Sequence, residues 1–313
     1  MRVVFFGLPL AALLLLRDGI EVALVATSRS RAPGIRRLRA LLGNERVVGT
    51  AEAEAPEFSE RVRATAPDLL VSWFWTKRIP RAVLEVPRLG AVGVHPSLLP
   101  RHRGPDPYFW AIESGDLETG VTAHRLDESY DTGAILAQRR IAMDAQWNAW
   151  TLAKRLDRPS LALLREVVGA FASGSPPAET PQREGEATLA PTPGEGLLAL
   201  RFHTEAAKVV RRIRAASPWP GAFTEIGDAL VILTKAREAS EFPRALLPGE
   251  AAVRADGRAV VRTRDTAVEL LAGRDEDDNP LDAAALAGLV KSASRPSSIG
   301  RARRRTKRQP RIG

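Results

Sequence analysis

Two polar side chains in the middle of the chain have the chemistry needed for proton transfer. His95 follows the apolar run 91–94 and opens a proline-bounded loop, and Asp131 stands in a turn that ends at Gly133. A histidine titrates near neutral pH, and a carboxylate behind it fixes the imidazole tautomer and favours the charged form. Brought together in a cleft, the two groups would act as a catalytic pair. Kept apart, they would be a turn cap and a solvated loop residue.

The residues around His95 and Asp131 predict the elements that would position them. Four apolar runs predict strands, at 2–6, 22–27, 67–75 and 91–94. A helix over 10–17, between the first two runs, completes the strand–helix–strand order of a parallel sheet covered on both faces. Ligands bind at the carboxyl edge of such sheets, and His95 would lie there. Two further runs, 119–126 and 134–142, predict strands on either side of the Asp131 turn.

The composition changes after the predicted helix 150–171. That helix contains Pro159, which we expect to kink or restart it because proline lacks a backbone donor and clashes with the preceding turn. Residues 174–196 then carry five prolines among Gly, Ser, Glu and Thr, which is typical of a linker. A helix at 206–213 and four short strands follow, at 229–235, 251–254, 258–262 and 266–271. With Asp256-Gly257 as a hairpin turn, they predict a small antiparallel barrel.

The net charge of +9 belongs to the C-terminal end of the chain. Residues 291–313 hold nine of the 46 basic residues and no acid, which leaves 37 basic against 37 acidic residues elsewhere. This tail has too few apolar residues to bury a core, so we expect it to stay disordered. RNA, an anionic membrane surface and no partner at all are its alternatives, in that order.

The chain lacks residues that several classes of function require, and this excludes or disfavours those classes. The chain has no cysteine, which excludes disulfides and thiolate chemistry and suits a cytoplasmic protein. Its four histidines show no metal-ligand spacing, so we expect no metal. The apolar run 3–16 has the length of a signal peptide, but Arg17-Asp18-Gly19 replaces the small-residue cleavage site, which favours a strand and helix. No run is long enough to span a bilayer, so we expect no membrane partner. We also expect a monomer.

Three segments together resemble a known family. They are His95-x-Ser97-Leu98-Leu99-Pro100-x-x-Arg103-Gly104, Gly115-Asp116-x-x-Thr119-Gly120-Val121-Thr122 and Asp131-Thr132-Gly133. This combination is similar to the formyltransferases that use 10-formyltetrahydrofolate, and within them to the methionyl-tRNA formyltransferases. The resemblance continues through 181–191 and 213–222 to 248–250.

The resemblance implies a fold and a domain plan. The expected class is α/β, with a Rossmann-like, mostly parallel sheet in a formyltransferase domain over 1–173. A linker over 174–197 leads to an OB-like β-barrel domain over 198–275. A short helix and the disordered basic tail would occupy 276–313.

The resemblance also implies roles for individual residues. His95 and Asp131 would be catalytic, and Gly93 stands at the position of the family's catalytic Asn. The residues expected around the folate cosubstrate are Trp73, Phe74, Trp75, Ser97, Leu98, Leu99, Pro100 and Asp127. Either tryptophan alone is equally well explained as core packing. His124 is expected to be a strand-pairing or surface residue, and His102 to be positional.

A cluster of arginines points to an anionic partner. The residues expected to contact tRNA are Arg29, Arg31, Arg36, Arg37, Arg39 and Arg103. Arginine matches the geometry of phosphate oxygens, and the first five fall where methionyl-tRNA formyltransferases carry a basic loop. The alternative is a solvated loop leading into an amphipathic helix whose Ile35 and Leu38 face inward.

Gly93 departs from the family pattern Asn-x-His. The resemblance implies that this amide donates to the formyl oxygen as it becomes an oxyanion, and losing one such donor costs about 2.7–4 kcal/mol. Three explanations stay open. Another donor, such as Ser97, a backbone N–H or a water, replaces it; the enzyme has moved to another amine acceptor; or the site is inactive.

The function implied is formyl transfer from 10-formyltetrahydrofolate to initiator methionyl-tRNA, in translation initiation. An amino sugar nucleotide is the alternative acceptor. A catalytically silent RNA-binding relative is the alternative of a different class.

Overall fold

The computed structural model describes residues 1–29 and 31–293, and these form two compact units. Unit 1 comprises residues 1–200 and 207–222, and unit 2 comprises 201–206 and the described residues from 223 onward. The predicted disordered tail, from residue 294, lies outside the described residues. No helix in the described part of the chain is long and apolar enough to cross a membrane.

Unit 1 is built on a seven-stranded sheet in the order β3-β2-β1-β4-β5-β6-β7. Its strands are β1 (Arg2–Gly7), β2 (Glu21–Ala26), β3 (Val47–Val48), β4 (Leu69–Trp73), β5 (Ala91–His95), β6 (Glu118–Arg125) and β7 (Ile135–Ala142). The first five are parallel, and β6 and β7 join antiparallel. The predicted α/β class with a mostly parallel sheet is therefore confirmed.

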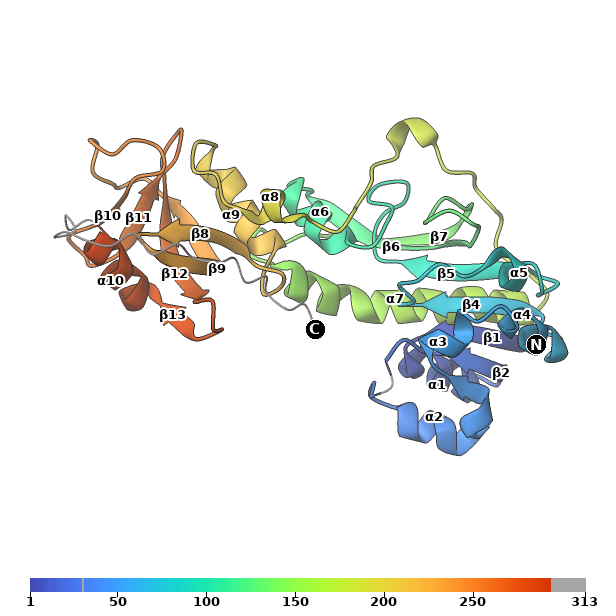
Figure 1. Ribbon diagram of the computed structural model, residues 1–313. Coiled ribbons are helices and arrows are strands. Elements are labelled where there is room, and N and C mark those ends of the chain that lie inside the picture. Colours follow the sequence, from blue (N-terminus) through green and yellow to red (C-terminus); the bar gives the residue numbers. More distant parts are fainter. Residues whose placement is uncertain (30, 294–313) are drawn as a thin grey trace. The chain divides into compact units, whose positions relative to one another are not determined.

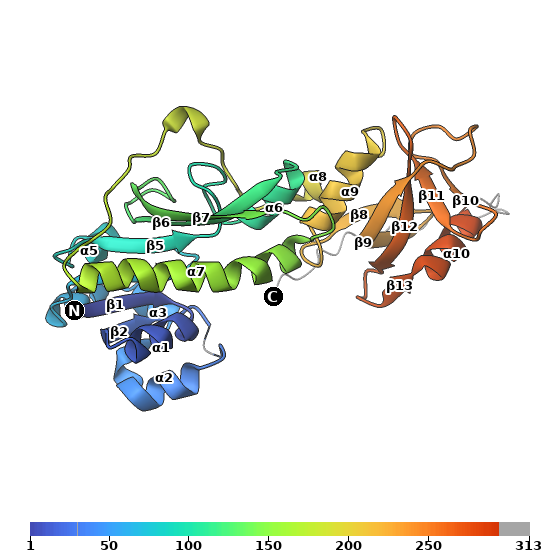
Figure 2. The ribbon, with the colours of Figure 1, turned by 180° about the vertical axis from the view of Figure 1, so that it is seen from behind.

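Helices cover both faces of this sheet (Figure 1). They are α1 (Pro9–Arg17), α2 (Ile35–Leu42), α3 (Thr50–Ala53), α4 (Phe58–Ala64), α5 (Arg81–Leu84), α6 (Pro107–Glu113) and α7 (Ala149–Ala172). One core joins Val4 and Phe6 of β1 to side chains of α3, α4 and α5. Helix α7 packs against β5, β6 and β7 (Figure 2). Because both faces are covered, the central strands are continuous apolar runs.

Helix α7 runs through Pro159 as one element, so of the two expected effects, a kink or a restart, the restart does not occur. Its N-terminus is capped by the Asn148 side chain, which accepts from the Thr151 N–H. The buried face of α7 holds Ser160, whose hydroxyl accepts a 2.7 Å hydrogen bond from Trp73 Nε1. The apolar packing of this face outweighs the loss of one helical hydrogen bond at the proline.

The segment predicted to be a linker is part of unit 1. Thr180 exchanges backbone hydrogen bonds with Ile135, and the Ala190 N–H donates to the carbonyl oxygen of Arg103. Two short elements, η2 (Glu184–Glu186) and α8 (Glu195–Leu198), lie along it. Helix α9 (Ala206–Ala215) also belongs mostly to unit 1, because its Arg212 pairs with Glu113 of α6. The compact units therefore differ from the predicted division at residue 198.

Unit 2 contains an antiparallel sheet in the order β10-β11-β12-β9-β8, with β13 beside β12. Its elements are β8 (Ala222–Ile226), β9 (Ala229–Ala239), β10 (Ala251–Val253), β11 (Ala259–Arg262), β12 (Ala267–Arg274), β13 (Pro280–Asp282) and α10 (Ala283–Ala293). The four predicted strands are present, and Gly257 has a positive φ in the predicted hairpin turn. Strands β8 and β13 were not predicted.

The Trp73–Ser160 hydrogen bond yields a test of how α7 is held to the sheet. Ser160→Ala leaves the buried indole N–H without a partner, which we expect to cost about 1–3 kcal/mol. Urea unfolding followed by tryptophan fluorescence measures it for unit 1 alone, because all six tryptophans lie there. Ser173→Ala, at the exposed end of the same helix, is the control and should change stability by at most ~0.5 kcal/mol. Equal losses in the two variants would contradict this role of Ser160.

Candidate active site

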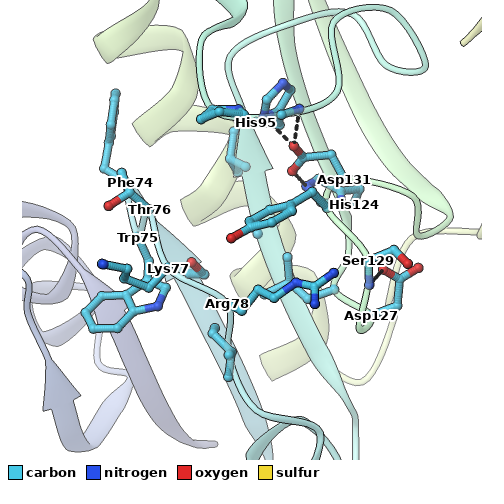
Figure 3. Close-up of a pocket in the computed structure, with 18 of the residues that line it drawn as sticks. Phe74, Trp75, Thr76, Lys77, Arg78, His95, His124, Asp127, Ser129 and Asp131 are labelled. Carbon is cyan, nitrogen blue, oxygen red and sulfur yellow. Dashed lines mark hydrogen bonds and ion pairs between the residues drawn. The ribbon is translucent and has the colours of Figure 1, made fainter. Parts of the chain in front are cut away.

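A pocket of about 410 Å³ opens at the carboxyl ends of β4 and β5. One wall is the segment after β4, Phe74 to Ile79, and the other holds His95, His124 and the segment Leu126–Asp131 (Figure 3). Its volume is in the range of small-molecule sites, and its lining combines apolar side chains with a few polar groups. The predicted edge of the sheet is therefore where the pocket lies.

The pocket brings His95 and Asp131 together. His95 is the last residue of β5, is 7% exposed, and its Nδ1 lies 3.4 Å from Asp131 Oδ2. Its other ring nitrogen, Nε2, donates to the carbonyl oxygen of His102 at 2.8 Å. Asp131 Oδ2 in turn accepts the Gly104 N–H at 2.8 Å. Each group is thus held by the backbone of the loop that follows β5.

His102 and Asp131 both have left-handed backbone conformations, with φ of +60° and +58°. Such conformations are costly outside glycine, so the surroundings must hold them. The His102 ring hydrogen-bonds Asp116 Oδ2 at 2.7 Å, and the backbone N–H of His102 donates to Thr188 Oγ1. Burial alone would raise the pKa of Asp116, but His102 and Arg101 lower it overall. The His102 carbonyl is therefore fixed toward His95, which agrees with the positional role expected of His102.

Arg103 is a structural clamp, which corrects the prediction that it contacts tRNA. It is 6% exposed, and its guanidinium donates to Gln182 Oε1 and to both carboxylate oxygens of Glu184. The Gln182 amide also donates to the carbonyl oxygens of Asp131 and Gly133. One side chain from the segment 174–197 thus joins Arg103 to the Asp131 turn. A phosphate would have to displace these partners to reach the guanidinium.

Only some of the residues predicted to surround the folate line the pocket. Phe74, Trp75 and Asp127 line the pocket. Trp73 does not, because it is buried beneath the sheet against Ser160, so its prediction as a pocket residue was wrong. The loop residues outside the pocket lining are Ser97, Leu98, Leu99 and Pro100.

The loop at 97–100 shapes the site from behind. The Ser97 hydroxyl donates to the Arg101 carbonyl oxygen at 2.6 Å and is fully buried. Thr122 on β6 accepts from the Leu99 N–H and donates to the Ser97 carbonyl oxygen. Ser97 therefore cannot supply the donor that Gly93 lacks, and this suggested replacement is ruled out by its geometry.

Gly93 lies on β5 directly opposite His124 on β6. A Cβ at position 93 would lie 2.8 Å from Leu126 Cδ2, so a side chain there requires Leu126 to move. His124 is a strand-pairing residue, as expected, but it is not a surface residue, because it is 2% exposed and lines the pocket. The only sequence signal for a buried His124 is that it lies two residues before the apolar Leu126, because residues two apart on a strand share a face.

Two buried donors lie in the pocket walls, one on the predicted Trp75 and one on Tyr108, which the sequence reasoning missed. Trp75 Nε1 and Tyr108 Oη have no hydrogen-bond partner among the described residues. Burial, with Asp157 and Asp106 nearby, raises the pKa of Tyr108, so its hydroxyl stays protonated as a donor. Unpartnered buried donors are rare in native proteins and indicate a place for a ligand with acceptor atoms.

The chain matches two family models that follow its two parts. Residues 14–168 match the model described as formyl transferase, and residues 197–289 match the formyl transferase C-terminal domain. The methionyl-tRNA formyltransferase of Myxococcus xanthus is 36% identical over 75% of this chain and 79% of its own length. The chain belongs to the formyltransferase family. The methionyl-tRNA formyltransferase of Sorangium cellulosum is 31% identical over 91% of this chain and 96% of its own.

Solved structures show the same fold as this formyltransferase. HypX from Aquifex aeolicus, solved in complex with tetrahydrofolic acid, superposes with a TM-score of 0.63 at 22% identity. The alignment covers 92% of this chain and 47% of HypX, so the chain spans about half of that protein. No group of three or more His, Asp or Glu in the described part of the chain is arranged to hold a metal ion.

Gln182 provides a test of how the formyltransferase holds its Asp131 turn. Gln182→Ala removes the acceptor for a buried guanidinium and the donor for two carbonyls, so we expect unit 1 to lose about 2–3 kcal/mol. Gln146→Ala, at an exposed turn, is the matched control and should stay within ~0.5 kcal/mol of the native chain. Tryptophan-monitored urea unfolding measures both. A Gln182→Ala chain as stable as the control would exclude the clamp.

Proposed function

We propose that this formyltransferase transfers the formyl group of 10-formyltetrahydrofolate to the amino group of initiator methionyl-tRNA. The observation that carries the chemistry is the His95–Asp131 pair at the pocket on the carboxyl edge of the sheet. The acceptor is supported by relatives named methionyl-tRNA formyltransferase, which match nearly the whole chain at 31% identity and three quarters of it at 36%.

The pocket suits a folate as formyl donor. A pterin is a flat heterocycle edged with hydrogen-bond acceptors and donors. Phe74, Ile79 and Leu126 supply apolar surface for such a ring, and Trp75 Nε1 and Tyr108 Oη are donors without partners. Asp127 offers a carboxylate at the other wall, where it already accepts from Thr132.

The site residues account for the proton movements of formyl transfer. When an amine attacks a formyl carbon, the oxygen gains negative charge, the amine must lose a proton and the leaving nitrogen must gain one. His95 meets the oxygen and supplies a proton, and Asp131 orders the amine and takes its proton. Holding both reactants in register contributes a further term of up to ~7–11 kcal/mol.

The basic segment before and within α2 fits the tRNA partner. Arg29, Arg31, Arg36, Arg37 and Arg39 are exposed, while Ile35 and Leu38 between them are buried. None of the five has an ion pair within the described part of the chain, so their guanidinium groups are available to phosphate oxygens. Helix α2 is therefore compatible with both interpretations of this segment, the amphipathic helix and the contact with tRNA, because its buried face is apolar and its exposed face is basic.

The proposed function is tested by formyl transfer with purified protein, 10-formyltetrahydrofolate and methionyl-tRNA. We expect transfer by the native chain and losses of ~100-fold or more in kcat for His95→Ala and for Asp131→Asn. His203→Ala, at an exposed position of unit 2, is the control and should retain native rates. Transfer to an amino sugar nucleotide but not to methionyl-tRNA would overturn the acceptor, and folate-independent RNA binding without transfer would overturn the enzyme.

Gly93 leads to a separate prediction. An amide donor returned to this position should stabilise the oxyanion, but the Cβ needs the space of Leu126 Cδ2. We therefore expect Gly93→Asn combined with Leu126→Ala to transfer faster than Leu126→Ala alone, by up to ~100-fold in kcat. Leu126→Ala is the matched control for the lost apolar contact. Equal rates in the two variants would show that the site does not use a donor from position 93.

A further inference from the structure

A second imidazole lies in the active site. His124 is paired with Gly93 across β5 and β6, so its ring stands on the face of the sheet where position 93 has no side chain. The His95 and His124 ring centroids are 6.4 Å apart, and the planes are inclined by 83°. Figure 3 shows Asp131 between the two rings, and His124 Nε2 lies 3.5 Å from Asp131 Oδ1.

The hydrogen bonds of the two rings assign their tautomers. His124 Nδ1 lies 2.8 Å from the carbonyl oxygen of Arg125, and His95 Nε2 lies 2.8 Å from that of His102. A carbonyl oxygen only accepts, so each of these nitrogens carries a hydrogen. The opposite nitrogens, His95 Nδ1 and His124 Nε2, both face the carboxylate of Asp131.

The two ring contacts with Asp131 depend on how many protons the cluster holds. If both rings were neutral, two lone pairs would face a carboxylate from opposite sides, at 3.4 and 3.5 Å, and neither contact would be attractive. One proton held by any of the three groups would make at least one contact attractive. Burial lowers the pKa of His124, with His95 adding to this and Asp131 and Asp127 opposing it. The neutral form of His124 is therefore favoured, and its Nε2 lone pair faces Asp131.

We propose that His124 is a proton-relay residue that acts through Asp131, so that His95, Asp131 and His124 share one proton during formyl transfer. This rests on the proposed function, and it adds a residue to the His95–Asp131 pair. His124 is a positioning and relay residue here, because its Nε2 faces Asp131 and the reactants are met by the other two groups.

The relay balances as follows. The acceptor nitrogen bonds to the formyl carbon, and, once His95 has given up its own proton, the proton of that nitrogen passes to Asp131 and then from Oδ1 to His124 Nε2. His95 gives the proton on Nδ1 to the folate nitrogen as the bond between that nitrogen and the formyl carbon breaks. His124 then returns its proton through Asp131 to His95, and the cluster regains the state in which it started.

Imidazole NMR titration of the full chain without substrates tests the relay directly. The chain has only four histidines, so single variants assign every signal. We expect the His95 and His124 signals to titrate as a coupled pair, and the midpoint of His124 to rise by about one pH unit in His95→Gln. In Asp131→Asn the His124 midpoint should fall, because the Asp131 charge raises the pKa of His124. A His124 midpoint unmoved by His95→Gln would overturn the proposal, whatever the acceptor proves to be.

Steady-state kinetics provide a second test of the relay. His124→Met keeps an unbranched side chain of similar volume but carries no proton, and we expect kcat to fall by ~100-fold with little change in KM for the formyl donor. His203→Gln, in which the histidine lost is outside the site, should retain native kcat. Native kcat in His124→Met would overturn the relay. If the native chain fails to formylate methionyl-tRNA at all, the proposed function fails, and the NMR coupling still decides the relay.

Discussion

The carboxylate of Asp131 is the interaction on which the active site depends. It stands between two imidazoles, and each ring is oriented by a backbone carbonyl at its far nitrogen. Asp131 itself is fixed by the Gly104 N–H and has a left-handed backbone that the surrounding loop must hold. A shift of this one residue would break both ring contacts at once, so the rest of unit 1 is best understood as what prevents that shift.

The restraint comes from a segment far away in sequence. Gln182 binds the backbone of the Asp131 turn with its amide nitrogen and Arg103 with its oxygen, so two loops that converge on the pocket are joined by one side chain. Thr188 holds His102 from the same segment. A proline-rich stretch suits this task because its backbone is stiff, loses little entropy on docking and leaves many groups free to bond elsewhere.

The sequence predicted the parts of the site that local patterns determine. Apolar runs located the strands, and the edge rule placed His95 beside the pocket. It could not predict that Arg103 is buried, because nothing in the local sequence distinguishes a buried arginine from an exposed one. Arg103 is covered by residues 182–184, which are far away in the sequence. Trp73 and Trp75 are two residues apart on the same strand end, yet the first packs on Ser160 and the second lines the pocket. The turn after β4, where Phe74 has a φ of +57°, directs the two tryptophan side chains to different places. The alternation of side chains along a strand does not predict such a turn.

The glycine at position 93 is explained by its neighbours across the strand pair. A side chain there would compete for space with Leu126, which closes the pocket, and would stand beside the His124 ring. The three positions therefore form one packing unit on one face of β5 and β6, in which a small residue on one strand matches large ones on the other. In the proposed relay this unit places a second titratable group beside Asp131, so proton transfer at the site depends on where a proton resides. The relay would tie the reaction to the protonation state of the cluster around Asp131, in which two imidazoles face one carboxylate.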